Sequence, residues 1–89
     1  MQATTATETI NGFPIIATFN FAPAGYLRGG RVIIADRGES HTFDRYVATT
    51  QLATDGILDN SWSQGHYCTS LVTAFATFTD LALKTIRED

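Results

Sequence analysis

The fold of this chain is decided by three stretches: FDRYVATTQL (residues 43–52), SWSQGHYC (61–68) and SLVTAFATFTDLALKTIR (70–87). The first two stretches are rich in β-branched and aromatic residues, which favour strands. The segment between them contains Asp55-Gly56 and Asp59-Asn60, both common turn formers. The third stretch has the periodicity of a helix. Together they predict an antiparallel strand pair followed by one long helix.

The predicted helix, over residues 70–87, is amphipathic. Cys68-Thr69-Ser70 supplies a hydroxyl N-cap, whose side-chain oxygen can accept from the free amides of the first turn. One face is apolar and consists of Leu71, Ala74, Phe75, Phe78, Leu81, Ala82 and Ile86. The opposite face carries Thr73, Thr77, Asp80, Lys84 and Arg87. Val72, Ala76 and Leu83 flank the apolar face, which indicates either a wide contact with a curved sheet or a seam for a partner.

The first half of the chain predicts three further strands. Asn11-Gly12 is a strong hairpin signal, since both turn positions need positive φ, and it joins strands over 5–10 and 13–21. The apolar run over 31–36 predicts a central strand. In the strand over 13–21, alternation predicts one common face, made of Ile15, Ala17, Phe19 and Phe21. The fold class is therefore α+β: an antiparallel sheet of about four or five strands with the C-terminal helix packed on one face.

Length and composition bound the function. A chain of 89 residues forms a single domain, residues 1–89, with little bulk for a deep catalytic cavity. One cysteine excludes an internal disulfide, and no apolar run approaches the ~20 residues that cross a bilayer. The N-terminus has no basic start followed by an apolar core, so it does not resemble a secretory signal. We expect a cytoplasmic monomer with no membrane contact.

Catalytic and metal chemistry have weak candidates. His66 and Cys68 lie two residues apart on a predicted strand and so share a face, where a nucleophile pair or half a metal site could form. A structural zinc site usually needs four ligands, and His41 is the one further histidine. The simpler interpretation is a half-buried histidine and a cysteine packed under the helix start. We therefore expect no enzyme activity, no catalytic residue, no metal and no cofactor.

Acidic residues suggest a binding surface instead. Between Gly38 and Leu83 the chain has five acids, and Arg45 is the one Lys or Arg. If these acids share a surface, their negative field would attract a basic partner. The predicted partner-binding residues are Glu39, Asp44, Asp55, Asp59 and Trp62. For Asp55 and Asp59 a plain turn role is the alternative, and for Trp62 core packing against the helix is the alternative.

A second hypothesis uses basic residues. Arg28, Arg31 and Arg37 surround Gly29-Gly30, and arginine side chains with free amides could contact phosphates. This predicts a small nucleic-acid-binding or regulatory protein of a mobile element that uses the Arg28–Arg37 region. A net charge of −3 opposes it, because domains that bind nucleic acid are normally basic. A tight Gly-Gly turn with solvated arginines is the structural alternative.

The pattern of FDRYV (43–47), a turn-rich loop, SWSQGHY (61–67) and an amphipathic helix resembles short accessory proteins of bacteriophages and other mobile elements. Within that group the chain is similar to anti-CRISPR proteins in length, mild acidity and α+β build. The resemblance covers residues 43–89 in pattern and carries over no individual functional residue. It implies a stoichiometric inhibitor that binds a Cas effector complex of a bacterial host and blocks its nucleic-acid recognition through an acidic surface. The charge of −3 is smaller than that of strongly acidic members, which departs from full DNA mimicry.

Overall fold

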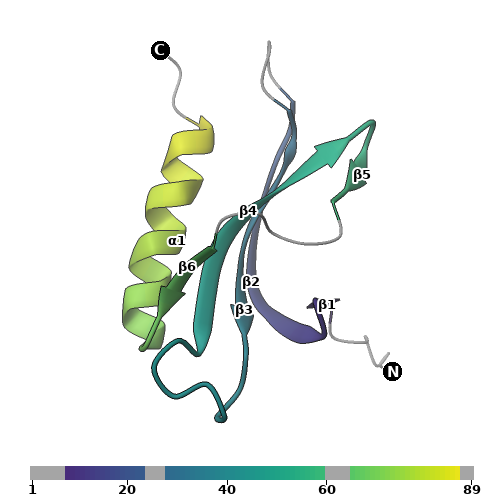
Figure 1. Cartoon of the computed structure of the whole chain (residues 1–89). Coiled ribbons are helices and arrows are strands. Elements are labelled where there is room, and N and C mark those ends of the chain that lie inside the picture. Colours follow the sequence, from purple (N-terminus) through teal and green to yellow (C-terminus); the bar gives the residue numbers. More distant parts are fainter. Residues whose placement is uncertain (1–7, 24–27, 60–64, 87–89) are drawn as a thin grey trace, which may run out of the picture.

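One helix packs on a curved antiparallel sheet in the computed structural model of this protein (Figure 1). The structure describes residues 8–23, 28–59 and 65–86. The strands are β1 (Thr9–Ile10), β2 (Phe13–Phe21), β3 (Gly30–Asp36), β4 (Tyr46–Thr54), β5 (Ile57–Leu58) and β6 (Gly65–Cys68), and α1 is Leu71–Ile86. They pair in the order β1-β2-β3-β4-β5, and β6 also pairs with β4. The α+β prediction is confirmed, with six described strands.

Two tight turns set the hairpins. Asn11 and Gly12 have φ of 53° and 84°, as the hairpin between β1 and β2 requires. Asp55 and Gly56 repeat this geometry, with φ of 54° and 82°. The second turn was expected, but the strand that it creates was not, since β5 has two residues and leaves no periodic signal. The β4–β5 pair therefore extends the sheet beyond the predicted one.

Strand boundaries agree best for the central elements. Strand β2 covers the predicted residues, and β3 begins one residue earlier than predicted. The prediction for 43–52 was wrong at both ends: residues 43–45 belong to the β3–β4 loop, and β4 continues to Thr54. In the predicted strand 61–68 the described part is Gly65–Cys68, and residues 61–64 lie outside the described residues. In the predicted strand 5–10, β1 occupies the last two positions, and residues 5–7 lie outside the described residues.

A bulge in β2 changes which way its side chains point. Ile15 is opposite Ala35, whereas Ala17 is opposite Ile34, so one residue is inserted between them. Because neighbouring residues of β3 face opposite sides, Ile15 and Ala17 also lie on opposite faces of the sheet. The expected common face of Ile15, Ala17, Phe19 and Phe21 is thus wrong at Ile15.

The protein has two small apolar cores, one on each face of the sheet. On the α1 side, Ile34, Ala48, Cys68 and Ala74 are buried, with Phe78 and Leu81 packed against them. On the other side, Ile10, Ile33 and Ala35 are buried, with Phe13 and Ile15 packed against them. Strand β3 supplies side chains to both cores, so both faces of the centre of the sheet are covered.

Helix α1 is rotated relative to the sequence expectation. Thr77, predicted on the exposed side, is half-buried, and its Oγ1 lies 4.0 Å from Cys68 Sγ. Val72 is 81% exposed, and Phe75, Leu83 and Ile86 are exposed as well. The helix therefore has a second apolar side that does not contact the sheet. With its 16 residues, α1 is also too short to cross a bilayer.

The N-cap of α1 is formed as expected and can be tested. The amide of Thr73 donates to Ser70 Oγ at 3.2 Å. We expect Ser70→Ala to lower the free energy of unfolding by about 1 kcal/mol, because one helix amide loses its partner. Ser40→Ala, at an exposed turn, is the matched control and should change it by less than ~0.5 kcal/mol. Urea unfolding measures both, and equal effects would contradict the capping role.

Candidate functional site

The β3–β4 loop, residues 37–45, is held by several hydrogen bonds and ion pairs. The amide of Arg37 donates to the carbonyl oxygen of Arg45 at 2.8 Å, which closes the base of the loop. Asp36 accepts from Arg45 Nε at 2.8 Å, from Arg45 Nη2 at 3.1 Å and from the amide of Gly38 at 2.8 Å. These donors, with Arg45 the strongest, hold the pKa of Asp36 below its usual value despite partial burial.

Arg37 anchors the middle of this loop. Its guanidinium lies over the rings of Phe13 and Tyr67, 5.8 and 5.1 Å from their centroids. Nη1 of Arg37 pairs with the Asp44 carboxylate at 3.1 Å and donates to the Asp44 carbonyl oxygen at 3.2 Å. The arginine therefore connects the loop to β2 and to β6 at once.

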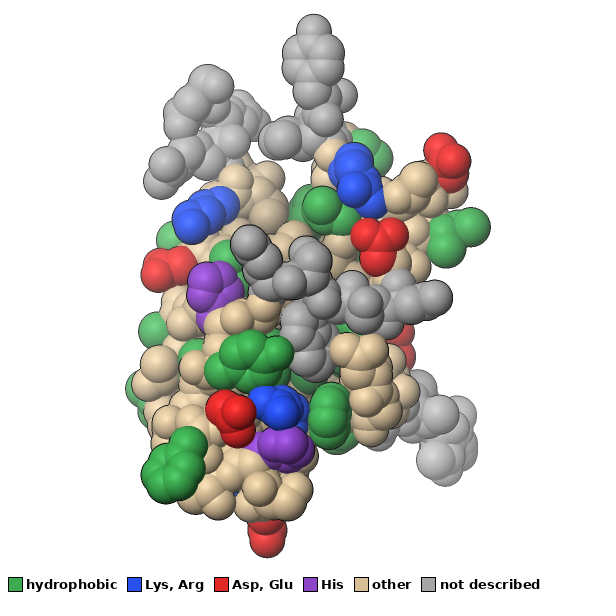
Figure 2. Space-filling model, viewed as in Figure 1, with side chains coloured by type: hydrophobic (Ala, Val, Ile, Leu, Met, Phe, Trp, Pro, Cys, Tyr) green, Lys and Arg blue, Asp and Glu red, His purple; other side chains and the backbone are tan. Residues whose placement is uncertain are grey.

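His41 completes the same cluster. Its ring meets Phe13 edge to face at 5.9 Å, and its Nδ1 lies 3.8 Å from Asp44. Figure 2 shows acidic, basic, histidine and apolar side chains side by side over this end of the molecule. The contacts of Arg37 and His41 hold the loop against β2 and β6, so the remaining residues of the loop have a rigid support.

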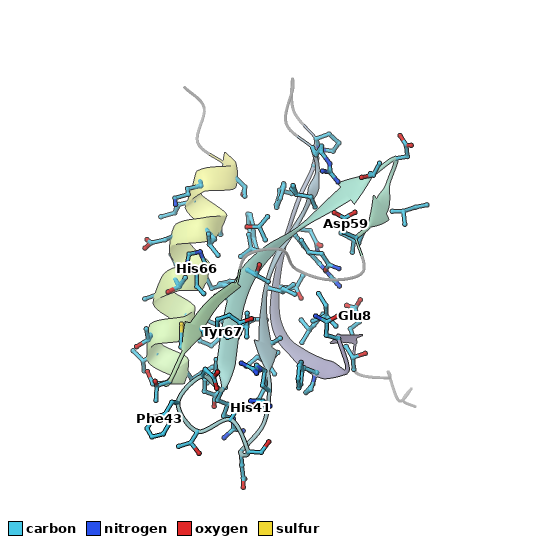
Figure 3. The ribbon with its side chains drawn as sticks, in the orientation of Figure 1. Glu8, His41, Phe43, Asp59, His66 and Tyr67 are labelled. Atoms are coloured by element: carbon cyan, nitrogen blue, oxygen red, sulfur yellow. The ribbon has the colours of Figure 1, made fainter. Side chains whose placement is uncertain are left out.

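Phe43 is an exposed residue of this loop. It is 83% exposed, although it is a large apolar side chain. Its carbonyl oxygen accepts from Thr69 Oγ1 at 2.7 Å, which ties the loop to the residues just before α1. Figure 3 shows Phe43 beside the first turn of α1. We call Glu39, Phe43 and Asp44 the loop-end surface.

The predicted acids fall into two groups. Glu39 and Asp44 belong to the loop-end surface, whereas Asp55 sits in the β4–β5 turn and Asp59 follows β5. Strand β4 separates the groups by eight residue steps, or about 26 Å. Figure 3 shows Asp59 far from Phe43 and His41. These acids do not form a single surface, and Trp62 lies outside the described residues.

Two of the acids are also partly neutralised. Asp44 pairs with Arg37, and Asp59 lies 3.5 Å from Arg28 Nη2 in an exposed, weak ion pair. Glu39 and Asp55 are both exposed. The negative electrostatic field predicted from the sequence is therefore reduced at Asp44 and Asp59.

The three arginines of the second hypothesis make contacts within the protein. The Arg31 side chain is 8% exposed, pairs with Glu8 at 3.0 Å and donates from Nε to Gln51 Oε1 at 2.7 Å. Arg28 donates to the carbonyl oxygen of Ala53 at 2.9 Å and to Thr54 Oγ1 at 2.5 Å. Arg37 is held by Asp44 and two rings. The three guanidinium groups therefore do not form a shared surface for phosphates.

His66 and Cys68 lie on β6, next to β4. They pair with Ala48 and Tyr46 of β4 and share a sheet face, as their spacing predicted. Cys68 is buried beneath α1, whereas His66 is exposed. Among the described residues, no three His, Cys, Asp or Glu side chains gather in a group that could hold a metal ion.

An open groove lies between the end of β2 and the β4–β5 hairpin. Its volume is about 680 Å³, and Phe21, Pro23 and Leu58 give it apolar walls. Arg28 and Asp55 are the charged residues among the described residues that line it. The described residues that line the groove include neither a Cys–His nor a Ser–His pair, so they offer no nucleophile with a base.

Comparison with protein-family models, with curated proteins and with solved structures found no match. Phe43 is the surface residue that sequence reasoning missed, because the strand predicted over 43–52 assigned it an ordinary place in the sheet. A usable signal was its position as the lone aromatic in the polar stretch from Arg37 to Arg45.

The Asp36–Arg45 pair gives a pH-dependent prediction. The pKa of Asp36 is lower in the folded state than the ordinary value of about 3.9, so its contribution is complete above that value and is lost as pH falls through the folded-state pKa. We expect Asp36→Asn to cost about 1 kcal/mol in urea unfolding at neutral pH, with the difference from wild type shrinking in acid.

Asp55→Asn is the matched control for this measurement. Asn tolerates the positive φ of that turn position, so this variant should keep wild-type stability at both pH values. A difference between Asp36→Asn and wild type that stays constant from neutral pH to acid would contradict the role of the carboxylate charge.

Proposed function

We propose that the protein is a non-enzymatic, stoichiometric inhibitor of the anti-CRISPR type, which binds a Cas effector complex in the cytoplasm of a bacterial host and blocks its nucleic-acid recognition. The supporting observation is Phe43, an aromatic side chain held 83% exposed on a loop with many internal contacts. Aromatic residues on protein surfaces are frequent anchors of protein–protein interfaces. No membrane and no direct contact with nucleic acid enter this proposal.

The rigidity of the loop favours tight binding. The contacts of Asp36, Arg37 and Asp44 order the loop before any partner arrives. A preorganised anchor loses little conformational entropy on binding, so more of its contact energy contributes to affinity. The Arg37 guanidinium, which lies over the rings of Phe13 and Tyr67, contributes to this order.

Charge supports a basic partner surface. Glu39, in the same loop as Phe43, is exposed, and Asp44, the residue after Phe43, has part of its charge compensated by Arg37. A groove that binds nucleic acid is lined with Lys and Arg, so it would meet these acids with complementary charge. The proposal thus concentrates partner binding at the loop-end surface and leaves Asp55 and Asp59 outside it.

The first test is functional. The chain is expressed in bacteria that carry one CRISPR–Cas effector type at a time, each programmed against an infecting phage. Phage plating should recover in the strain whose effector is the target and stay low in a strain with the empty vector. If plating recovers with none of the effector types, the proposed function is rejected.

The second test locates the surface. With the effector identified by plating, we expect Phe43→Ala to weaken binding by about 2 kcal/mol, or roughly 30-fold in Kd, because the anchor is removed. Glu39→Lys should also weaken binding, and more so at low salt. Asp59→Lys, the same type of charge change at a site far from Phe43, is the control and should bind as wild type does. Calorimetry measures all three, and undiminished binding of Phe43→Ala would reject the loop-end surface.

A further inference from the structure

No described strand pairs with the outer edge of β2 over most of its length. On its inner edge β2 pairs with β3 from Ile15 to Phe21, and on its outer edge β1 pairs with Phe13 and Pro14. Within residues 8–23, 28–59 and 65–86, no strand pairs with the outer edge from Ala17 to Phe21. Figure 1 shows β2 on the side of the sheet away from β6 and α1.

This edge lacks the usual protection against pairing. Natural sheets guard exposed edges with charged residues, proline or bulges. Pro14 and the bulge at Ile15–Ala17 guard only the start of β2, and the stretch IATFNF (16–21) contains no charge and no proline. A short run of β-prone, uncharged residues at an open edge is suited to accept another strand.

We propose that a second copy of this chain occupies the edge, with the two β2 strands antiparallel about a two-fold axis at Phe19. In this register the residues opposite each other are complementary. Ala17 faces Phe21 of the second copy, a small residue against a large one, and Thr18 faces Asn20, two groups that can hydrogen-bond. Phe19 faces Phe19, an aromatic cross-strand pair.

Other symmetric registers are poorer. An axis at Thr18 places Ile16, inside the bulge, opposite Asn20, and leaves Phe21 opposite the bulged segment. An axis at Asn20 leaves Ala17 opposite Pro23, beyond the end of the strand. The axis at Phe19 pairs the whole regular part of β2 with itself.

The proposed pairing would also increase the burial of the β2 phenylalanines. Phe19 and Phe21 lie on the α1 side of the sheet, yet both remain half-buried in the single chain. A two-fold axis perpendicular to the sheet places both helices on the same side and brings the Phe19 rings together. Five residues a side form a small interface, so the association is reversible and depends on concentration. It replaces the monomer expected from the sequence and does not use the loop-end surface.

A charge exchange tests the pairing. Thr18 and Asn20 are exposed, so Thr18→Lys/Asn20→Lys and Thr18→Asp/Asn20→Asp leave the cores intact. In each double variant like charges lie opposite each other, and self-association should weaken roughly tenfold. In a mixture of the two variants each Lys meets an Asp, so a heterodimer should form. Sedimentation equilibrium of the 9.7 kDa chain reads the mass, and native mass spectrometry identifies the heterodimer.

The control addresses the other exposed apolar side of the molecule. Val72→Lys/Leu83→Lys adds the same charges to the outer side of α1 and should leave self-association unchanged. Three outcomes overturn the proposal: a wild-type chain that stays monomeric up to millimolar concentration, β2 variants that associate as wild type does, or association lost only in the α1 variant. Circular dichroism checks folding, and single Asn20→Lys and Asn20→Asp variants repeat the test if a double variant unfolds.

Discussion

Burial of β3 on both of its faces is the constraint on which the rest of the structure depends. Val32, Ile33, Ile34 and Ala35 have no exposed surface, and alternate side chains point to opposite sides of the sheet. One layer cannot cover both sides, so α1 covers Ile34 while the bent start of β2, with β1, covers Ile33 and Ala35. The bulge in β2 turns Ile15 to the side of Ile33 and Ala35, while Ala17 lies on the α1 side.

This central burial also decides where function can lie. A chain of this size with two thin cores has its interior filled by β3 and its covers, so chemically distinctive groups are left for loops and edges. In the β3–β4 loop, the charged groups of Arg37, Asp36 and Asp44 form ion pairs that hold the loop in place. Rigidity is therefore achieved by polar and cation–π contacts where the apolar core cannot reach.

Local chemistry predicted much of the fold. The Asn11-Gly12 turn, the Ser70 cap and the apolar run in β3 each have a local physical cause, and each was found where expected. The failures arose from tertiary geometry. Ile15 follows the same alternation as Ala17 but faces the other way after the bulge, and Thr77 faces the sheet because α1 is rotated. The separation of Glu39 from Asp55 depends on the length and direction of β4, which charge counting along the chain does not contain.

The ion pair between Arg31 and Glu8 has a consequence for the ends of the chain. Arg31 lies within the sheet with its side chain 8% exposed, while Glu8, 67% exposed, reaches it from the segment before β1. A protease that trimmed the chain past Glu8 would leave a guanidinium without its counter-ion in the middle of the fold. Loss of one peripheral residue would thus leave a buried charge in the middle of the sheet without its ion-pair partner.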